Sequence, residues 1–221
     1  MIKTSSDRKE IKETAVEIVK TENDGSLVQP KMILASASPR RREILSKLGI
    51  PFEVIVSGAD ENSSASDPRE LVKELALLKA KDVFNKFNRQ ENVLVIGSDT
   101  VVDLNGRILG KPHDRTEADE MLKGLSGNSH KVHTGIAVIV RDRSGNITEY
   151  NEAETSVVNV DTLAPEEIEA YIESGEPFDK AGSYAIQGLF APYISSIEGD
   201  YYNIVGLPLN RLYRILKKYY R

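Results

Sequence analysis

The sequence contains no cysteine and only three histidines among its 221 residues. The absence of cysteine excludes disulfides, thiolate metal sites and a cysteine nucleophile, and it fits a reducing compartment. So few histidines argue against a histidine-rich zinc site. His130 and His133 lie three residues apart in an expected strand, so they point to opposite faces and make a poor metal-binding pair.

Long hydrophobic runs are also missing. No stretch approaches the roughly 20 apolar residues that are needed to span a bilayer, and the first 30 residues lack the apolar core of a secretory signal. The net charge is −5, which disfavours nucleic acid as the main partner but leaves room for a local basic pocket. We therefore expect a cytoplasmic protein with neither a membrane nor a nucleic-acid partner.

The chain divides into a polar start and a longer part in which apolar segments alternate with turn signals. We expect residues 1–30 to form an N-terminal extension that is mobile or loosely docked. The apolar residues Ile11, Ala15, Ile18 and Val19 suit at most a weak amphipathic helix there. Residues 31–221 are the predicted domain, and a chain of this length can bury a sizeable core.

Hydrophobic periodicity predicts strands and helices in alternation along this domain. The expected strands cover residues 31–36, 52–57, 93–99, 130–140, 147–160 and 191–197. The expected helices cover residues 39–48, 67–87, 116–126, 165–174 and 208–220, with Thr116 as the cap of the third helix and a hairpin around Asn105-Gly106. This order predicts an α/β protein with a mixed sheet that is flanked by helices.

The stretch LASASPRRREIL places three arginines in the first turn of an expected helix. Ser38 and Pro39 stand at the helix start, and Arg40, Arg41 and Arg42 follow. The N-terminus of a helix is the positive end of its dipole, so it favours anions and disfavours arginine. A serine cap, free backbone N–H groups and guanidiniums would suit a phosphate. A solvated surface helix is the alternative, since exposed charge–dipole terms are worth only about 0.3–1 kcal/mol.

Other polar residues follow expected strands, where ligands bind in open α/β sheets. Asp99 ends the apolar run VLVIGSD and is suited to hold a metal or activate water, although it could simply open a turn. Asp60 and Glu61 follow another strand, and either could complete a site for a hard cation with Asp99. Lys111 in LGKPHD suits phosphate, although most loop lysines and loop acids are merely solvated.

The loop FDKAGSYAIQG is the densest in groups that could contact a ligand. Its glycines permit close backbone approach, and its polar or aromatic candidates are Asp179, Lys180, Tyr184 and Gln187. A tight structural turn is the alternative. Neither the phosphate-binding G-x-x-x-x-G-K-[ST] motif nor a dinucleotide-binding G-x-G-x-x-G after a strand is present.

Taken in order, a set of stretches resembles the motifs of the Maf family of nucleoside triphosphate pyrophosphatases. They are LASASPRRREIL, GADE, LLKAK, IGSDTVV, LGKP, LSGNSHKVHTG, DKAGSYAIQG and NIVGLP. The resemblance implies an elongated α/β fold of two lobes with a central cleft, related to that of the inosine triphosphatases. It also implies hydrolysis of a nucleoside triphosphate to the monophosphate and pyrophosphate with a divalent metal, Mg²⁺ or Mn²⁺.

The resemblance also assigns expected roles to residues at matching positions. Asp99 matches the proposed general base, and Glu61 matches an acid that helps to hold the metal together with Asp99. The positions that match substrate-binding residues are Ser36, Ser38, Arg40 and Arg41 in the phosphate-binding motif, Lys79, Lys111 and Gln187 elsewhere in the site, and Thr100 near the base or sugar. Arg42 is expected to face solvent.

The substrate and the role in the cell are less closely defined. GSDTVV together with AGSYAIQG is similar to the branch of the family that prefers dTTP and UTP, so we expect a pyrimidine triphosphate, normal or modified, and a house-cleaning role in nucleotide pools. Family members are often homodimers. The alternatives are a non-catalytic nucleotide-binding regulator linked to cell division and a purine pyrophosphatase that acts on ITP or XTP. Two acids beside a triphosphate favour an enzyme, because like charges repel and a pure binder gains nothing from them.

Overall fold

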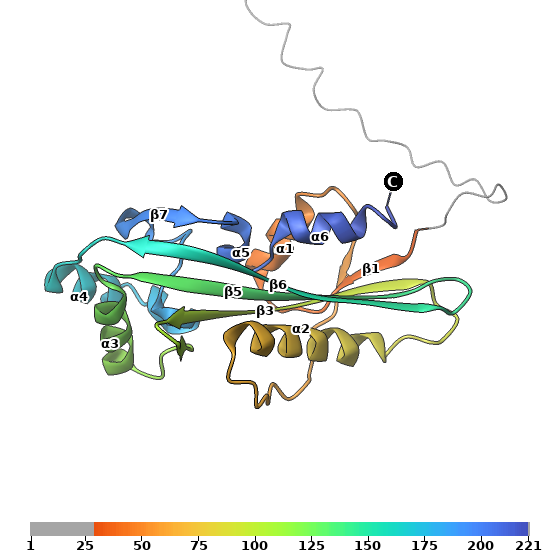
Figure 1. Ribbon diagram of the computed structural model, residues 1–221, viewed down its shortest axis with the longest axis horizontal. Coiled ribbons are helices and arrows are strands. Elements are labelled where there is room, and N and C mark those ends of the chain that lie inside the picture. Colours follow the sequence, from red (N-terminus) through yellow and green to blue (C-terminus); the bar gives the residue numbers. More distant parts are fainter. Residues whose placement is uncertain (1–28, 221) are drawn as a thin grey trace, which may run out of the picture.

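The apolar segments pair into one mixed sheet in the computed structural model, which describes residues 29–220. Within these residues the sheet has seven strands in the order β2-β1-β3-β5-β6-β7, with β4 paired to β3 (Figure 1). The strands are β1 (Lys31–Leu34), β2 (Glu53–Val54), β3 (Val93–Leu104), β4 (Arg107–Leu109), β5 (Ser129–Arg141), β6 (Ile147–Val160) and β7 (Ile194–Glu198). Strands β2, β1 and β3 are parallel and the other pairs are antiparallel, so the predicted mixed α/β sheet is confirmed.

Helices cover both faces of this sheet. They are α1 (Pro39–Ser46), α2 (Pro68–Phe84), α3 (Arg115–Leu125), α4 (Pro165–Glu173), α5 (Tyr201–Val205) and α6 (Leu209–Leu216), with the 3-10 turns η1 (Glu176–Asp179), η2 (Ala181–Ser183) and η3 (Ala191–Tyr193). Helix α2 lies on one face, and α1, α5 and α6 lie on the other (Figure 1). Within the described residues, none of these helices is long and apolar enough to cross a membrane.

Strand β3 is buried on both faces, as its continuous apolar run predicts. Leu94 and Ile96 pack in the cluster of α1 and α6, whereas Val93 and Val95 pack against α2 on the opposite face. Successive side chains of a strand alternate between its faces, so both faces of β3 need apolar residues. The carboxyl-terminal half of this strand carries the polar residues that matter for the site.

Two glycines let α2 lie unusually close to the sheet. A Cβ atom on Gly97 would lie 2.1 Å from the carbonyl oxygen of Ala76, and one on Gly135 would lie 2.0 Å from that of Val72. Any larger residue at either position would push the helix away from β3 and β5. This close approach brings Lys79 of α2 beside Asp99 of β3.

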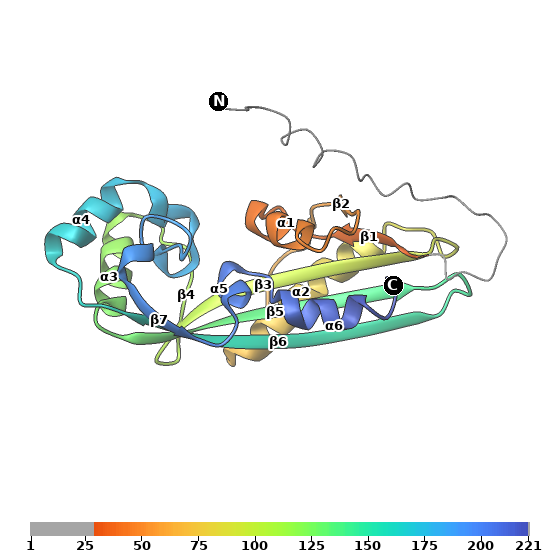
Figure 2. The same ribbon diagram turned by 90° about the horizontal axis from the view of Figure 1, so that it is seen from above.

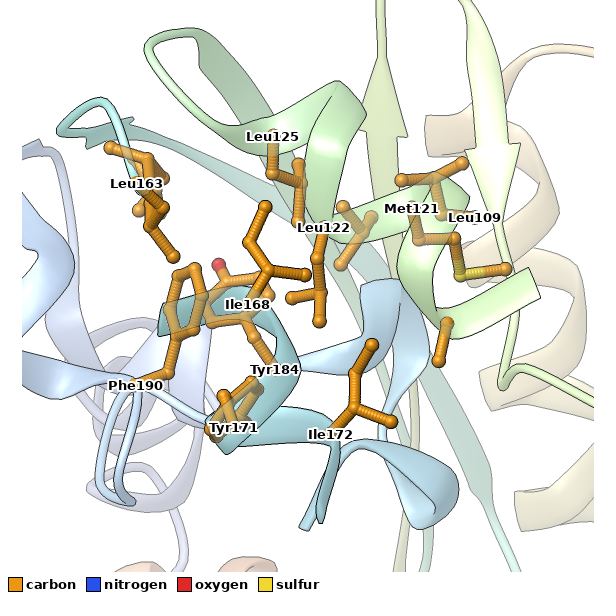
Figure 3. Packing of buried hydrophobic residues seen from close by; sticks show 14 of the residues in the cluster. Leu109, Met121, Leu122, Leu125, Leu163, Ile168, Tyr171, Ile172, Tyr184 and Phe190 are labelled. Carbon is orange, nitrogen blue, oxygen red and sulfur yellow. The ribbon is translucent and has the colours of Figure 1, made fainter. Parts of the chain in front are cut away.

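The molecule is elongated and has two lobes, as the resemblance implies (Figure 2). The large lobe contains α1, α2 and α6, and the small lobe contains α3, α4 and the 3-10 turns. The small lobe has its own core, which includes Leu122, Leu125, Ile168, Tyr171 and Phe190 (Figure 3). Strands β3, β5 and β6 run through both lobes.

Several local predictions are confirmed. Asp67 caps α2 by accepting hydrogen bonds from the backbone N–H groups of Arg69 and Glu70, at 2.9 and 3.0 Å. The hairpin turns at Asn105-Gly106, where both residues have positive φ. His130 and His133 do point to opposite faces, since the first contacts the Tyr184 hydroxyl and the second contacts Thr155.

Other local predictions are wrong. Helix α3 is capped by Asp114 rather than Thr116, because the Asp114 carboxylate reaches the N–H of Glu117 at 2.9 Å. The strand expected over residues 52–57 shortens to β2, and the first residues of the one expected over 191–197 form η3. Helix α5 was not predicted. The expected extension, residues 1–30, and its weak amphipathic helix fall outside the described residues except for the last two positions.

Candidate active site

A cavity of about 490 Å³ opens between the two lobes. Every site residue that the sequence predicts lines this one cavity. They are Ser36, Ser38, Arg40, Arg41, Glu61, Lys79, Asp99, Thr100, Lys111 and Gln187. Their roles remain predictions, but the fold gathers residues that lie up to 151 positions apart in the sequence.

The start of α1 forms one wall of the cavity. Ser38 is the N-cap, and its hydroxyl accepts the N–H of Arg41 at 3.5 Å, while the N–H of Ser38 donates to the Ser36 hydroxyl at 3.2 Å. Arg40 lies on the cavity wall and makes no hydrogen bond or ion pair with any described residue. Its guanidinium is therefore free to bind an anion. Arg42 is exposed, as predicted.

Arg41 has a different place from Arg40. Its Nε donates to the carbonyl oxygen of Gly206 at 2.8 Å, and its two terminal nitrogens donate to the Ser98 carbonyl at 2.9 Å, the Thr100 hydroxyl at 3.0 Å and the Ser36 hydroxyl at 3.4 Å. A guanidinium has five N–H groups, so at most one remains for a ligand. Burial lowers the pKa of Arg41, while the charge of Asp99 opposes that shift. Arg41 mainly joins α1, β3 and the end of α5.

Lys79 joins the two acids of the predicted site. Its Nζ lies 2.6 Å from Asp99 and 2.8 Å from Glu61. The side chains of Lys79 and Asp99 are 12% and 13% exposed, whereas that of Glu61 is 54% exposed. The ammonium therefore forms ion pairs with both carboxylates. Asp60 does not line the cavity, and its carboxylate accepts a hydrogen bond from Asn62 at 2.6 Å.

The two carboxylates around Lys79 fit a small divalent cation. Both approach one cationic nitrogen closely, so a single metal ion near that position could contact both. No group of three or more potential acidic or histidine ligands occurs within the described residues. Mg²⁺ is commonly held by one or two carboxylates, with water and substrate phosphates as the remaining ligands. Glu61 and Asp99 suit that mode of binding.

The small lobe supplies the opposite wall. Lys111 follows β4 and Gln187 follows η2, and both are exposed and without hydrogen bonds or ion pairs to described residues. The two loops are joined where the N–H of Gly182 donates to the carbonyl oxygen of Gly110 at 2.9 Å. This wall therefore presents polar side chains on a tied backbone.

An apolar part of the cavity lies beside these polar residues. Its lining includes Val102, Val132, Tyr184, Ile186 and Ile204. Sequence reasoning missed the contribution of α5, although NIVGLP carries part of the family resemblance. Its short length provides no helical periodicity that could have revealed it.

A buried histidine holds Tyr184 in place through its hydroxyl group. His130 Nε2 lies 2.7 Å from the Tyr184 hydroxyl, and the tyrosine ring packs against Phe190 (Figure 3). Burial lowers the pKa of His130 to about 4, so the imidazole is neutral at pH 7. Burial also raises the pKa of Tyr184. This hydrogen bond holds one wall of the cavity in place.

Fold and site together define an α/β protein built to bind a phosphorylated ligand, with cations on both walls of a cleft and a pair of carboxylates between them. The profile of the family described as Maf-like protein matches residues 31–219. The chain therefore belongs to the Maf family, as its motifs indicate.

Curated relatives are similar over most of their length. One from Lachnoclostridium phytofermentans, named dTTP/UTP pyrophosphatase, is 49% identical over 189 residues, which cover 86% of this chain and 95% of the relative. Relatives of the same name from Bacillus anthracis and Bacillus cereus are 48% and 49% identical over 190 residues, with the same coverage.

Solved structures with a similar fold are more distant. The Ham1 protein of Staphylococcus aureus has 13% sequence identity and a TM-score of 0.46, with 85% of this chain and 98% of that chain covered. A nucleoside-triphosphatase / dITP/XTP pyrophosphatase from Mycobacterium abscessus has 14% identity and a TM-score of 0.38, with 66% and 94% covered.

Proposed function

We propose that this protein is a nucleoside triphosphate pyrophosphatase that hydrolyses dTTP and UTP, or modified pyrimidine triphosphates, to the monophosphate and pyrophosphate. The observation that supports it best is the position of Asp99. This carboxylate lies midway along β3, rather than at the strand end that the apolar run predicts, and inside a cavity whose walls carry cations that suit phosphate. Family membership and the names of relatives that are about half identical support the same reaction.

Substrate binding divides between the lobes. The guanidinium and backbone N–H of Arg40 suit phosphate oxygens on one side, whereas the N–H groups of Ser38, Arg41 and Arg42 are bonded within the protein. Lys111 suits phosphate oxygens on the other side. The apolar part of the cavity beside Gln187 and Thr100 suits a nucleobase and sugar. Arg41 contributes mainly by fixing Thr100 and Ser36, with at most one N–H directed at the phosphates.

In the proposed reaction, water attacks the α-phosphorus and the bond to the oxygen that bridges the α- and β-phosphates breaks. Asp99 orients this water and accepts its proton, and pyrophosphate leaves. Lys79 holds the Asp99 carboxylate in place through its contact at 2.6 Å and offers its own charge to the phosphates. Arg40 and Lys111 stabilise the negative charge that grows on the leaving group. No covalent intermediate is needed.

A divalent cation, Mg²⁺ or Mn²⁺, would be held by Glu61 and Asp99 and would neutralise phosphate charge and make a bound water more acidic. With such a cation bound, the two carboxylates would give up part of their contact with Lys79. Glu61 is more than half exposed, so its side chain has the freedom to make that exchange.

The direct test is to incubate the full chain with dTTP, UTP, CTP, GTP, ITP and XTP in Mg²⁺ buffer and to measure pyrophosphate and nucleotide products. We expect pyrophosphate and monophosphate in equal amounts, fastest from dTTP and UTP. Diphosphate and inorganic phosphate would instead mean cleavage between the β- and γ-phosphates. The isosteric variant Asp99→Asn is the matched control for contaminating activity.

The alternatives give different results in the same assay. A purine pyrophosphatase would prefer ITP or XTP, and a nucleotide-binding regulator would release no pyrophosphate from any triphosphate. Either outcome contradicts the proposal. We also propose a cytoplasmic location, with which the lack of cysteine agrees.

A further inference from the structure

Asp179 is an acid on the phosphate-binding side of the cavity that the proposed reaction does not use. It ends η1 in the small lobe and lines the cavity together with its neighbour Lys180. The Asp179 carboxylate forms an ion pair with Lys180. The Asp179 side chain is 71% exposed and the Lys180 side chain is 13% exposed, so a nearly buried cation is paired with an acid that is free to move.

Asp179 shares the cavity with a cation from the other lobe, since Arg40 of α1 lines the same cavity. The Arg40 side chain has no hydrogen-bond partner among the described residues. The hydrogen bond from Lys180 lowers the pKa of the Asp179 carboxyl most, and the charge of Arg40 contributes in the same direction. The carboxylate is thus paired with one cation, and a second cation without a partner lines the opposite wall.

The backbone ties the loop that carries Lys180 to the loop that carries Lys111. Gly182 donates to Gly110 at 2.9 Å and has a φ of +70°, where a side chain would be strained. A Cβ on Gly182 would also lie 3.0 Å from the side chain of Val102. Because the loops are tied at this point, both lysines belong to one wall.

We propose that Lys180 is a further phosphate-binding residue and that Asp179 holds Lys180 and shields Arg40 until a triphosphate displaces its carboxylate. This inference rests on the proposed function and adds a residue pair that favours ligands with several negative charges. A triphosphate offers several anionic oxygens to Lys180 and Arg40, so it competes well with one carboxylate. The monophosphate product carries less charge and competes less well, which favours its release.

The physical properties of the pair suit such an exchange. A cation that is nearly buried needs an anion close by, since removing its partner leaves an uncompensated charge. An exposed carboxylate gives up little when it turns towards solvent, because exposed ion pairs contribute little to stability. The cost of displacing Asp179 is therefore small, while Lys180 stays paired before and after substrate binding.

The test is calorimetric titration of the full chain with inorganic pyrophosphate in Mg²⁺ buffer. Asp179→Asn removes one exposed like charge beside the anion, so pyrophosphate should bind about fivefold more tightly. Lys180→Met removes a charged hydrogen-bond donor, so binding should weaken by about tenfold. In steady-state assays with dTTP, Asp179→Asn should lower KM and strengthen inhibition by pyrophosphate.

A matched control pair lies on α3 in the same lobe. Asp119 and Lys123 form an ion pair at 2.6 Å, and neither lines the cavity. Asp119→Asn and Lys123→Met change the net charge in the same way, so they should leave pyrophosphate affinity within about twofold of wild type if only local charge matters.

Pyrophosphate affinity that is unchanged or weaker in Asp179→Asn would overturn the inference, and so would an equal effect of Asp119→Asn. If Lys180→Met does not fold, the Asp179→Asn titration still decides the question. Formation of pyrophosphate from dTTP by the wild-type chain is measured separately. Normal turnover without the Asp179 effect rejects this inference alone, whereas no turnover with any triphosphate rejects the proposed function.

Discussion

The two walls of the cavity are built differently. In the wall formed by α1, α2 and β3, the polar side chains other than Arg40 are mostly held by protein partners: Arg41 contacts two carbonyls and two hydroxyls, and Lys79 contacts two acids. In the small-lobe wall, Lys111 and Gln187 have no such partners among the described residues. Apart from Arg40, the first wall is fixed before substrate arrives, whereas Lys111 and Gln187 of the second wall are free to adapt to it.

This difference matches the two tasks of the proposed enzyme. Proton transfer to Asp99 requires a base that is held within a fraction of an ångström, which strands and helices provide. Gripping a flexible polyphosphate tolerates mobile cations on loops. The comparison predicts that substitutions in the fixed wall reduce kcat or stability, whereas those in the adaptable wall mainly change KM.

The largest expected effect comes from Asp99→Asn. The amide keeps the shape of the side chain but cannot accept the proton, so kcat should fall on the order of 10³-fold or more. Lys79 keeps Glu61 as a partner, so the melting temperature should change little. Turnover of dTTP and thermal unfolding measure the two quantities. Near-normal kcat would remove Asp99 from its proposed role.

Arg41 and Arg40 offer the sharpest contrast between neighbours. Arg41→Met removes four hydrogen bonds and leaves only the Ser98 hydroxyl as a donor to the Gly206 carbonyl, so it should cost about 3 kcal/mol of unfolding free energy and lower kcat. Arg40→Met removes a cation without a protein partner, so KM should rise about tenfold with unchanged stability. Urea denaturation and steady-state kinetics separate the two effects. Equal stability of both variants would contradict the structural role of Arg41.

The smallest expected effect at neutral pH concerns the hydrogen bond between His130 and Tyr184. The pKa of His130 is about 4 in the folded protein, below its ordinary value of 6.5. As the pH falls, His130 is therefore protonated in the unfolded chain before it is protonated in the folded protein. The free energy of unfolding is retained above pH 6.5 and decreases as the pH falls towards 4. The loss should approach about 3 kcal/mol at pH 4.

His130→Gln is the variant that isolates this loss. Glutamine retains a polar group near the Tyr184 hydroxyl but does not titrate, so the variant should show a shallower fall in stability over the same pH range. Urea denaturation at pH 7, 6, 5 and 4 provides the comparison. Parallel curves for the wild type and the variant would show that His130 does not cause the loss.

Local chemistry was predictable from the sequence where one short segment determines it. The Asp67 cap and the Asn105-Gly106 hairpin depend on neighbouring residues, and both were predicted correctly. The cap of α3 was placed two residues late, because both Asp114 and Thr116 are suitable caps and only the backbone geometry selects between them. Helix α5 is too short for its periodicity to be recognised.

The site was predictable as a set of residues but not as a set of contacts. The motifs predicted ten residues that all line one cavity. Nothing in LASASPRRREIL, however, distinguishes Arg40 from Arg41. That distinction depends on Ser98 and Gly206, which lie 57 and 165 residues from Arg41 in the sequence. Pairings of this kind arise from tertiary packing, so a single sequence carries no signal for them.

The long strands set the mechanical properties of the cleft. Strands β5 and β6 stay in unbroken register from Ser129 opposite Asn159 to Arg141 opposite Ile147, and β3 pairs with β5 through both lobes. The lobes are therefore two ends of one twisted ribbon rather than bodies on a flexible linker. Wide opening would require breaking the hydrogen bonds of the ladder. Substrates of different size must then be accommodated by side chains and loops at the rim, and the width of the cleft is a property of the sheet.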